Sequence, residues 1–333
     1  MRMLFLLKIY GHSNVYLVCG MLYHIPILPP NNYYSMNYFK IMIGLFMSFC
    51  SCVNSVDKSE LSSMDYELFK GTAAETLAEA VKDGDTISIK KEILVNHVPV
   101  DMRSAEYGTS LLMIATYYNN IRSAKCLLEL GANPNLYNDT TKSWGENSIL
   151  IASRRMTPSP EMLKMLLSYG GDPNSQAKGV KYNNAREIVP MRDFALQVAA
   201  AYSIEKVKIL VQAKADINKM DNNPNNSAVF SAIIHNQMDV LLYLLQNGAD
   251  YTVKFKQGDY TTEKTIYKEC DILDMLRLLH YPLDSEKHRQ KKEVIRFLSK
   301  VGLDYSKTSI PNWVINWAKK EYPNSWKEYL SHY

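Results

Sequence analysis

The stretch LLELGANPN at residues 127–135 decides the fold of this chain, because close copies of it return along the sequence. Clear copies are LLSYGGDPN at 166–174, LVQAKADIN at 210–218 and LLQNGADYT at 244–252, and degenerate copies are ILVNHVPVD at 93–101 and FLSKVGLDY at 297–305. Successive copies start 34, 39, 44, 34 and 53 residues apart. A period of about 33 residues with a variable excess is typical of a helical solenoid with loop insertions. We therefore expect an elongated array that offers a binding surface.

Each copy has the composition of a helix end followed by a tight turn. In the copy at 127–135, leucines complete an apolar helix, Gly131 supplies the left-handed residue that ends it, and Asn-Pro-Asn makes the turn. A second, shorter apolar segment precedes each copy, most clearly within residues 194–218. Each repeat is therefore expected to consist of two helices and a turn.

This pattern resembles the ankyrin repeat. FALQVAA at 194–200 matches the first helix of that family, and LLQNGAD at 244–250 matches the end of its second helix. No copy has the family's T-P-L-H tetrapeptide intact, and Lys214 and His97 stand where the family has glycine. The resemblance implies an all-α solenoid of paired antiparallel helices with long finger-loop insertions. About six divergent repeats would occupy residues 72–305, and a C-terminal capping helix would lie within residues 306–333.

The first 52 residues are apolar and aromatic and contain no repeat. Residues 36–52 combine one lysine, a run of nine apolar residues and a Cys-Ser-Cys end, which is the pattern of a bacterial export signal. They resemble a lipoprotein signal, in which Cys52, or alternatively Cys50, carries the lipid. Val53, where an Asp would favour the inner membrane, favours the outer membrane. Residues 53–71 are then expected to be a polar tether. A signal within residues 1–23, or an N-terminal strand, remains as an alternative.

The sequence holds none of the arrangements that enzymes or metal sites require. Its seven histidines have no metal-site spacing, and there is no CxxC, HExxH, G-x-S-x-G or P-loop motif. The net charge is only +4, with acidic and basic residues interspersed, which argues against nucleic-acid binding. We therefore expect a protein that is not an enzyme and that uses no cofactor or metal.

The residues inserted beyond the period of about 33 lie between the second helix of one repeat and the first helix of the next. In the ankyrin fold this is the finger loop, which with the first helices forms the concave binding face. Three insertions, at 136–147, 175–193 and 253–265, place aromatic beside charged residues, and such residue types are enriched at interface hot spots. The candidate partner-binding residues are Tyr137, Asp139, Lys142, Trp144, Lys181, Tyr182, Arg186, Lys254, Phe255, Lys256 and Tyr260.

The export signal and the divergent repeats together resemble the exported ankyrin-repeat lipoproteins of Gram-negative bacteria. Several of these are immunity proteins against type VI secreted phospholipases. The resemblance implies a periplasmic, lipid-anchored monomer that forms a heterodimer with a cognate phospholipase toxin and covers its active-site entrance. Two alternatives stay open: a periplasmic scaffold that docks a resident enzyme, and a hydrolase whose site is assembled from distant loops. An inhibitor would abolish the enzymatic activity of its partner, whereas a scaffold would preserve that activity. A hydrolase would be active as the purified chain without a partner.

Overall fold

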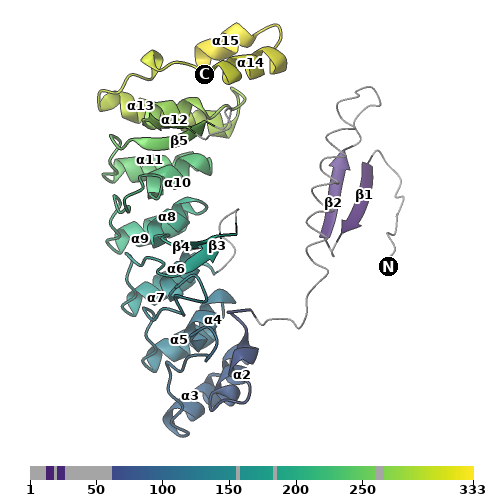
Figure 1. Ribbon diagram of the computed structural model, residues 1–333, viewed down its shortest axis with the longest axis vertical. Helices are drawn as coiled ribbons and strands as arrows, with labels where there is room; N and C mark the ends of the chain where they lie inside the picture. The colour runs from purple at the N-terminus through teal and green to yellow at the C-terminus, as the bar shows by residue number, and fades with distance from the viewer. Residues whose placement is uncertain (1–12, 19–20, 27–61, 155–157, 183–185, 260–265) are drawn as a thin grey trace. The chain divides into compact units, whose positions relative to one another are not determined.

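The computed structural model describes residues 13–18, 21–26, 62–154, 158–182, 186–259 and 266–333 (Figure 1). The chain divides into two compact units, Met1–Glu60 and Leu61–Tyr333. In the first unit, strands β1 (Ser13–Val18) and β2 (Met21–Pro26) form an antiparallel hairpin. The expected lipoprotein signal at residues 36–52, including Cys50 and Cys52, lies outside the described residues. Among the helices that are described, none has the length and apolar character needed to cross a membrane.

The described part of the second unit contains six consecutive helix pairs. The first helix of each pair is called the inner helix and the second is called the outer helix. The pairs are α2 (Glu75–Asp83) with α3 (Thr86–Leu94), α4 (Leu111–Tyr117) with α5 (Ile121–Glu129), α6 (Ser148–Ser153) with α7 (Pro160–Ser168), α8 (Ala195–Ala200) with α9 (Ile204–Gln212), α10 (Ala228–Ile234) with α11 (Met238–Gln246), and α12 (Ile272–Arg277) with α13 (Glu286–Lys300). The pairs stack one above another in sequence order (Figure 1). Inner helices α4, α6, α8 and α10 contact their neighbours, as do outer helices α3, α5, α7 and α9. This confirms the predicted all-α solenoid.

A left-handed residue ends the outer helices, as the recurring glycine predicts. Gly131, Gly170 and Gly248 have φ values of 93°, 85° and 93°. Gly302 (φ 93°) is the corresponding left-handed residue after α13. It is the sixth residue of its copy, whereas the glycine is the fifth residue in the clear copies that have it. Where the repeat lacks the glycine, the backbone keeps the same conformation, since Lys214 has φ 69° and His97 has φ 54°. A side chain with a Cβ is strained in this region, so both positions cost stability.

Replacing Lys214 with glycine is expected to raise the free energy of unfolding by about 1 kcal/mol, because glycine adopts φ near 69° without the Cβ clash. Urea denaturation of the wild type and the variant measures the gain. Lys214→Ala removes the same exposed side chain but keeps the Cβ, and it should give no gain. Equal stabilisation by both variants would contradict the backbone explanation.

The final asparagine of the repeated phrase ties each repeat to the next. The side-chain oxygens of Asn135, Asn174 and Asn218 each accept a hydrogen bond of 2.8 Å from the backbone N–H of the aspartate in the following copy, namely Asp172, Asp216 and Asp250. The amide of Asn135 also donates to the carbonyl oxygen of Gly170 at 2.8 Å. These bonds satisfy backbone groups in the turns and explain why asparagine recurs at this position.

The polar tether predicted at residues 53–71 ends earlier than expected. Residues 62–71 pack on the first repeat and include a short 3-10 helix, η1 (Tyr66–Phe69), whose Phe69 is buried in the main core. Thr109 Oγ1 donates to the carbonyl oxygen of Ser63 at 2.8 Å. No repeat precedes α2 and α3 among the described residues, and Phe69 is buried in the main core beside them. Met64 packs with Met113 of α4 and Ile151 of α6 in a smaller cluster.

The C-terminal segment forms two helices where the sequence predicts a single capping helix. They are α14 (Asn312–Glu321) and α15 (Trp326–His332), and Pro323 between them disfavours helical backbone at the residue before it. A 3-10 helix, η2 (Tyr305–Lys307), links the last repeat to α14. Tyr329 Oη donates to the carbonyl oxygen of Tyr281 at 2.9 Å, which fixes α15 to the last repeat.

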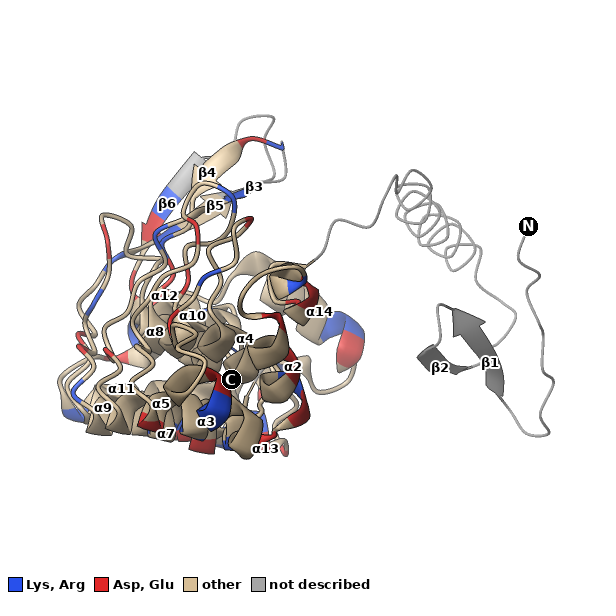
Figure 2. Cartoon of the chain, turned by 90° about the horizontal axis from the view of Figure 1, so that it is seen from below, with Lys and Arg blue, Asp and Glu red and all other residues tan. Residues whose placement is uncertain are grey.

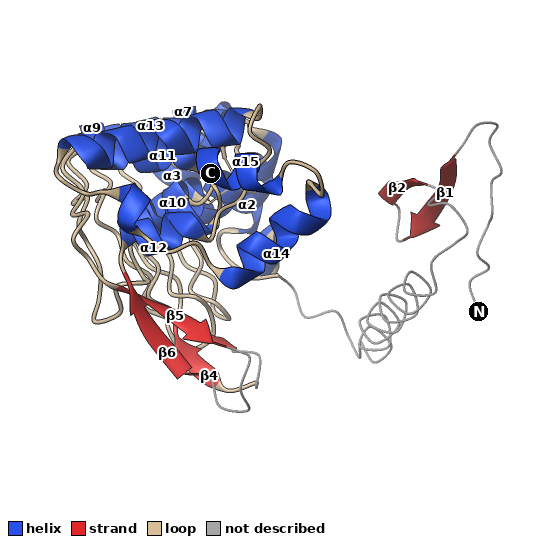
Figure 3. Cartoon of the chain, turned by 90° about the horizontal axis from the view of Figure 1, so that it is seen from above, coloured by secondary structure: helices blue, strands red, loops and turns tan. Residues whose placement is uncertain are grey.

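Two of the finger-loop insertions form short antiparallel hairpins. Strands β3 (Val180–Tyr182) and β4 (Ile188–Pro190) form the first, and β5 (Phe255–Asp259) and β6 (Ile266–Cys270) form the second. Figure 3 shows both hairpins projecting from the side opposite the outer helices α7, α9, α11 and α13. The insertions that the sequence places between repeats therefore gather on one side of the array, here called the finger side.

Candidate functional site

The first two finger loops are joined by backbone hydrogen bonds. The N–H groups of residues 178–180 donate to the carbonyl oxygens of residues 143–145 at 3.0–3.1 Å. Glycine makes this close approach possible at both crossing points. A Cβ on Gly179 would lie 2.1 Å from the carbonyl oxygen of Ser143, and a Cβ on Gly145 would lie 2.2 Å from the backbone nitrogen of Gly179. The described parts of the two loops are therefore held together as one unit, here called the paired fingers (residues 136–147, 175–182 and 186–193).

Two of the predicted binding residues in the first loop stabilise the loop itself. Tyr137 is half-buried, and Lys178 Nζ lies 4.1 Å from the centre of its ring. The Oδ1 atom of Asp139 accepts hydrogen bonds from the side chain and backbone of Thr141 and from the backbone of Lys142, and these bonds lower the pKa of Asp139. Lys142 itself is exposed.

Trp144 is an exposed aromatic residue of the paired fingers. It is 46% exposed, and the guanidinium carbon of Arg154 lies 4.6 Å from the centre of its ring. Arg154 Nε donates to Glu146 Oε1 at 2.7 Å, and its guanidinium also lies 3.8 Å from Asp193. Burial raises the pKa of Glu146, although the adjacent Arg154 acts in the opposite direction. The cation under Trp144 is thus held by two carboxylates, which pre-orders the ring for a contact.

The remaining candidates fall into three groups. Lys181, Arg186 and Lys256 are exposed on the finger side, where blue and red segments alternate along the loops (Figure 2). Lys254 pairs with Asp271 at 3.4 Å across the base of the second hairpin. The side chain of Tyr182 and the whole of Tyr260 lie outside the described part of the chain.

Phe255 is a core residue, which corrects its assignment to the binding surface. Its side chain is 1% exposed, and its ring lies 5.5 Å from that of Phe230. The backbone of the next residue, Lys256, is fixed by the Asn225 amide, which accepts from its N–H at 2.9 Å and donates to its carbonyl at 2.6 Å. Side chains alternate along a strand, so this fixed register turns Phe255 inward and Lys256 outward.

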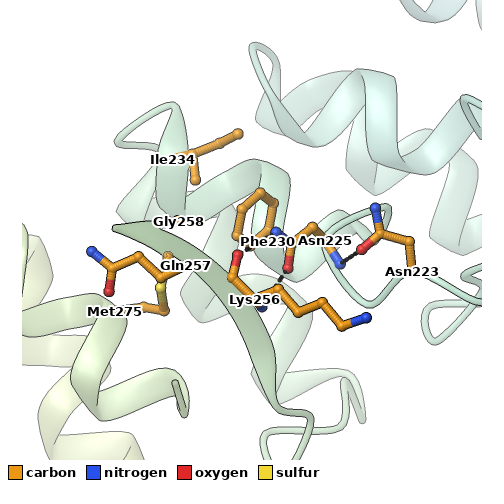
Figure 4. A pocket seen from close by; sticks show the side chains of 8 residues that line it. All are labelled: Asn223, Asn225, Phe230, Ile234, Lys256, Gln257, Gly258 and Met275. Atoms are coloured by element: carbon orange, nitrogen blue, oxygen red, sulfur yellow. Dashed lines mark hydrogen bonds between the residues drawn. The ribbon is translucent and has the colours of Figure 1, made fainter. Parts of the chain in front are cut away.

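An open groove lies between the inner helix α10 and the second hairpin (Figure 4). It has a volume of about 790 Å³ and a mixed lining made by Asn223, Asn225, Phe230, Ile234, Lys256, Gln257, Gly258 and Met275. Ile234, at the end of α10, is 47% exposed. Of the groove residues, the sequence predicts only Lys256 as a contact. We call this feature the finger groove.

Exposed aromatics at the ends of the inner helices are a second feature that the sequence analysis missed. Tyr117 is the last residue of α4, Tyr118 follows it directly, and Tyr202 lies just beyond the end of α8. Tyr202 makes an edge contact with His235 of the next repeat, with ring centres 5.1 Å apart. Tyrosines at the ends of the first helices of two repeats are the signal that could have found them. Within the described ranges, no three His, Cys, Asp or Glu side chains gather as metal ligands would.

The chain belongs to the ankyrin-repeat family. The family model described as ankyrin repeats (3 copies) matches residues 77–177 and 149–255, which together cover more than half of the chain. Ankyrin repeats define a protein–protein interaction module, and the stacked helix pairs with finger loops on one side agree with this class.

Three relatives share this repeat. The ankyrin repeat and SAM domain-containing protein 6 of Rattus norvegicus is 31% identical over 101 residues, covering 30% of this chain and 9% of the rat protein. The ankyrin repeat, SAM and basic leucine zipper domain-containing protein 1 of Carollia perspicillata is 35% identical over 104 residues, covering 30% and 20%. Ankyrin repeat protein FPV014 of fowlpox virus is 23% identical over 188 residues, covering 56% and 39%. The chain therefore spans less than half the length of each relative.

Proposed function

We propose that this chain binds a protein partner on its finger side, through the paired fingers and the finger groove. The finger groove carries this proposal. It is open, it combines apolar Ile234 and Phe230 with amide and lysine side chains, and its wall is fixed by the Asn225 pairing with Lys256. Interfaces concentrate their energy where an anchor of one partner enters a pre-formed pocket of the other.

The paired fingers supply the complementary element, an anchor on the surface of this chain. Trp144 is half-exposed and is held over Arg154. The same pair of loops also carries the exposed cations Lys142, Lys181 and Arg186. An aromatic centre with a charged rim is the arrangement typical of interface hot spots.

We further propose that the partner is a secreted antibacterial phospholipase and that the chain is its immunity protein. The support is the resemblance of residues 36–52 to a lipoprotein signal, combined with divergent ankyrin repeats. The three relatives are animal and viral proteins and carry no argument about this partner. In this proposal a periplasmic monomer, anchored through Cys52, forms a heterodimer with the toxin. Inhibition is by occlusion: the finger side covers the entrance to the lipase site, and this chain makes or breaks no bond.

The direct test is capture of the partner from producing cells, followed by an assay of its phospholipase activity. The bait should comprise residues 62–333, because the side chains of Met64 and Phe69 are buried in the folded array. We expect a phospholipase whose activity falls to background at one equivalent of this chain. A captured enzyme that stays fully active in the complex would instead establish the scaffold alternative.

Trp144→Ala is expected to weaken the complex by about 2 kcal/mol, because an exposed tryptophan held by a cation is a typical interface anchor. Calorimetric titration of the partner measures the loss. Trp313→Ala is a matched control, since Trp313 is 47% exposed and lies on the C-terminal helix α14. Equal affinity of the wild type and the Trp144 variant would remove the paired fingers from the interface.

Cys52→Ala is expected to abolish acylation and release the chain from the membrane fraction. The measurement is incorporation of a labelled fatty acid in producing cells, with Cys50→Ala as the matched variant. Loss of label in the Cys50 variant alone would assign the lipid to Cys50. Label retained in both variants would contradict the anchor.

A further inference from the structure

The second hairpin has a regular pairing that fixes the direction of its backbone groups. Strand β5 pairs with β6 without interruption, with Lys256 opposite Glu269 and Gly258 opposite Tyr267. In an antiparallel pair, opposite residues alternate between pairs that exchange two backbone hydrogen bonds and pairs whose N–H and C=O groups point away from each other. The direction of the Lys256 groups therefore determines the direction at every second residue of β5.

Asn225 shows that the Lys256 groups point out of the hairpin. Its side-chain oxygen accepts from the Lys256 N–H at 2.9 Å, and its amide nitrogen donates to the Lys256 carbonyl oxygen at 2.6 Å. The Asn225 amide thus pairs with β5 as the backbone of a third strand would. Gly258 lies two residues along the same strand, so its N–H and C=O also point out of the hairpin. Among the described residues, no group outside the hairpin donates to them or accepts from them.

The open edge at Gly258 borders the finger groove. Gly258 and Lys256 both line this groove, which has a volume of about 790 Å³ and lies against the inner helix α10 (Figure 4). A glycine inside a strand often marks a place where another backbone approaches closely. Gly258 therefore offers a backbone donor and a backbone acceptor at the wall of an open groove.

The residues around the groove indicate which side chains an added strand would carry. The Phe255 ring packs on Phe230, so this face of β5 is turned toward α10, where Ile234 is 47% exposed. Lys256 points to the other face, and it is the only charged residue among the eight that line the groove. Side chains alternate along a strand. An added strand would therefore place an apolar side chain against Phe230 and Ile234 and an acidic side chain, on an adjacent residue, near Lys256.

We propose that an extended segment of the protein partner binds in the finger groove and adds to β5 as a short strand beside Gly258. This inference rests on the proposed function, because it names the part of the partner that occupies the groove. Backbone hydrogen bonds to Gly258 hold the segment in register, and its neighbouring apolar and acidic side chains give selectivity. A helix of the partner could not pair in this way, because its own backbone groups are bonded within the helix. Asn225 occupies the edge at Lys256, so the added strand begins beyond it.

The test is amide hydrogen exchange at single-residue resolution, on this chain alone and in complex with the partner captured from producing cells. We expect exchange at the Gly258 N–H to slow about ten-fold or more in the complex, because a strand-pairing hydrogen bond protects the amide. The Lys256 N–H is an internal reference, since Asn225 already pairs with it in the free chain.

Three outcomes of this measurement would overturn the proposal. Slower exchange elsewhere on the finger side, with Gly258 unchanged, would exclude strand addition and leave the finger-side interface standing. Unchanged exchange over the whole finger side would overturn both the strand addition and the proposed interface. Protection of Gly258 that rises with the concentration of this chain alone would assign the edge to a second copy.

Gly258→Pro removes the N–H of the open edge and is expected to bind the same partner about ten-fold more weakly, because the partner loses a hydrogen bond. Proline is tolerated in a strand where the N–H is not used by the neighbouring strand. Gly258→Ala is the matched control: it keeps the N–H and should bind more tightly than the proline variant. Equal affinity of Gly258→Pro and the wild type would contradict strand addition. The exchange measurement needs no variant, so it decides the question if proline disturbs the hairpin.

Discussion

Replacing Phe255 with alanine is expected to lower the free energy of unfolding by about 3–5 kcal/mol. The ring is 1% exposed and packs against Phe230 of the inner helix α10. Removing it takes away the buried apolar surface and leaves a cavity beneath the second hairpin. The Asn225 amide holds the adjacent backbone in place, so the hairpin cannot easily move inward to fill the space. The loss should therefore lie near the upper end of the range.

Urea denaturation followed by circular dichroism measures this loss, and Lys256→Ala provides the control. Lys256 is the next residue on the same strand, and its side chain is exposed. Its replacement should change stability by less than about 0.5 kcal/mol. If Phe255→Ala were as stable as the wild type and bound the partner more weakly, Phe255 would return to the surface role that the sequence suggests.

Gly179→Ala is expected to cost about 3 kcal/mol or more and to separate the paired fingers. The added Cβ would lie 2.1 Å from the carbonyl oxygen of Ser143 and 2.3 Å from the carbonyl carbon of Trp144. Both are backbone atoms that cannot rotate away, so the loops must move apart. Three backbone hydrogen bonds join these segments, each with a net contribution of about 1 kcal/mol. Their loss also removes the support beneath Trp144.

Limited proteolysis together with thermal unfolding tests this prediction. The separated loops should be cleaved within residues 136–147 faster than in the wild type. Gly248→Ala is the matched control: its φ of 93° strains an alanine by about 1–2 kcal/mol, but no atom lies within 4 Å of the new Cβ. That variant should lose stability without exposing the first finger loop. Equal cleavage of both variants would show that the glycine pair does not hold the loops together.

Much of the fold follows from the repeated phrase alone. Its leucines and glycines locate the outer helices and their left-handed ends, and its asparagines mark the turns that bind one repeat to the next. The phrase also separates each repeat from its insertion, so the finger loops are found at the correct places. Local periodicity is sufficient for these features because each repeat contacts its sequence neighbours.

The candidate site was less accessible to sequence reasoning, because it depends on contacts between insertions. Nothing local distinguishes Phe255, which is buried, from Trp144, which is half-exposed. The Gly145 and Gly179 crossing is visible only when two loops of different repeats lie together. The finger groove likewise requires Asn225 of one loop to pair with the backbone of Lys256 in another. Aromatic composition alone could identify the loops but not the orientation of their side chains.

The most direct test of the finger side as the partner-binding surface is site-specific photo-crosslinking in producing cells. A photoreactive phenylalanine replaces Ile234 in the finger groove or, in a matched strain, Ile87 of the outer helix α3, which is 80% exposed. We predict a crosslinked heterodimer from position 234 and none from position 87. A heterodimer formed from position 87 alone would place the partner on the outer helices and contradict the proposed binding surface.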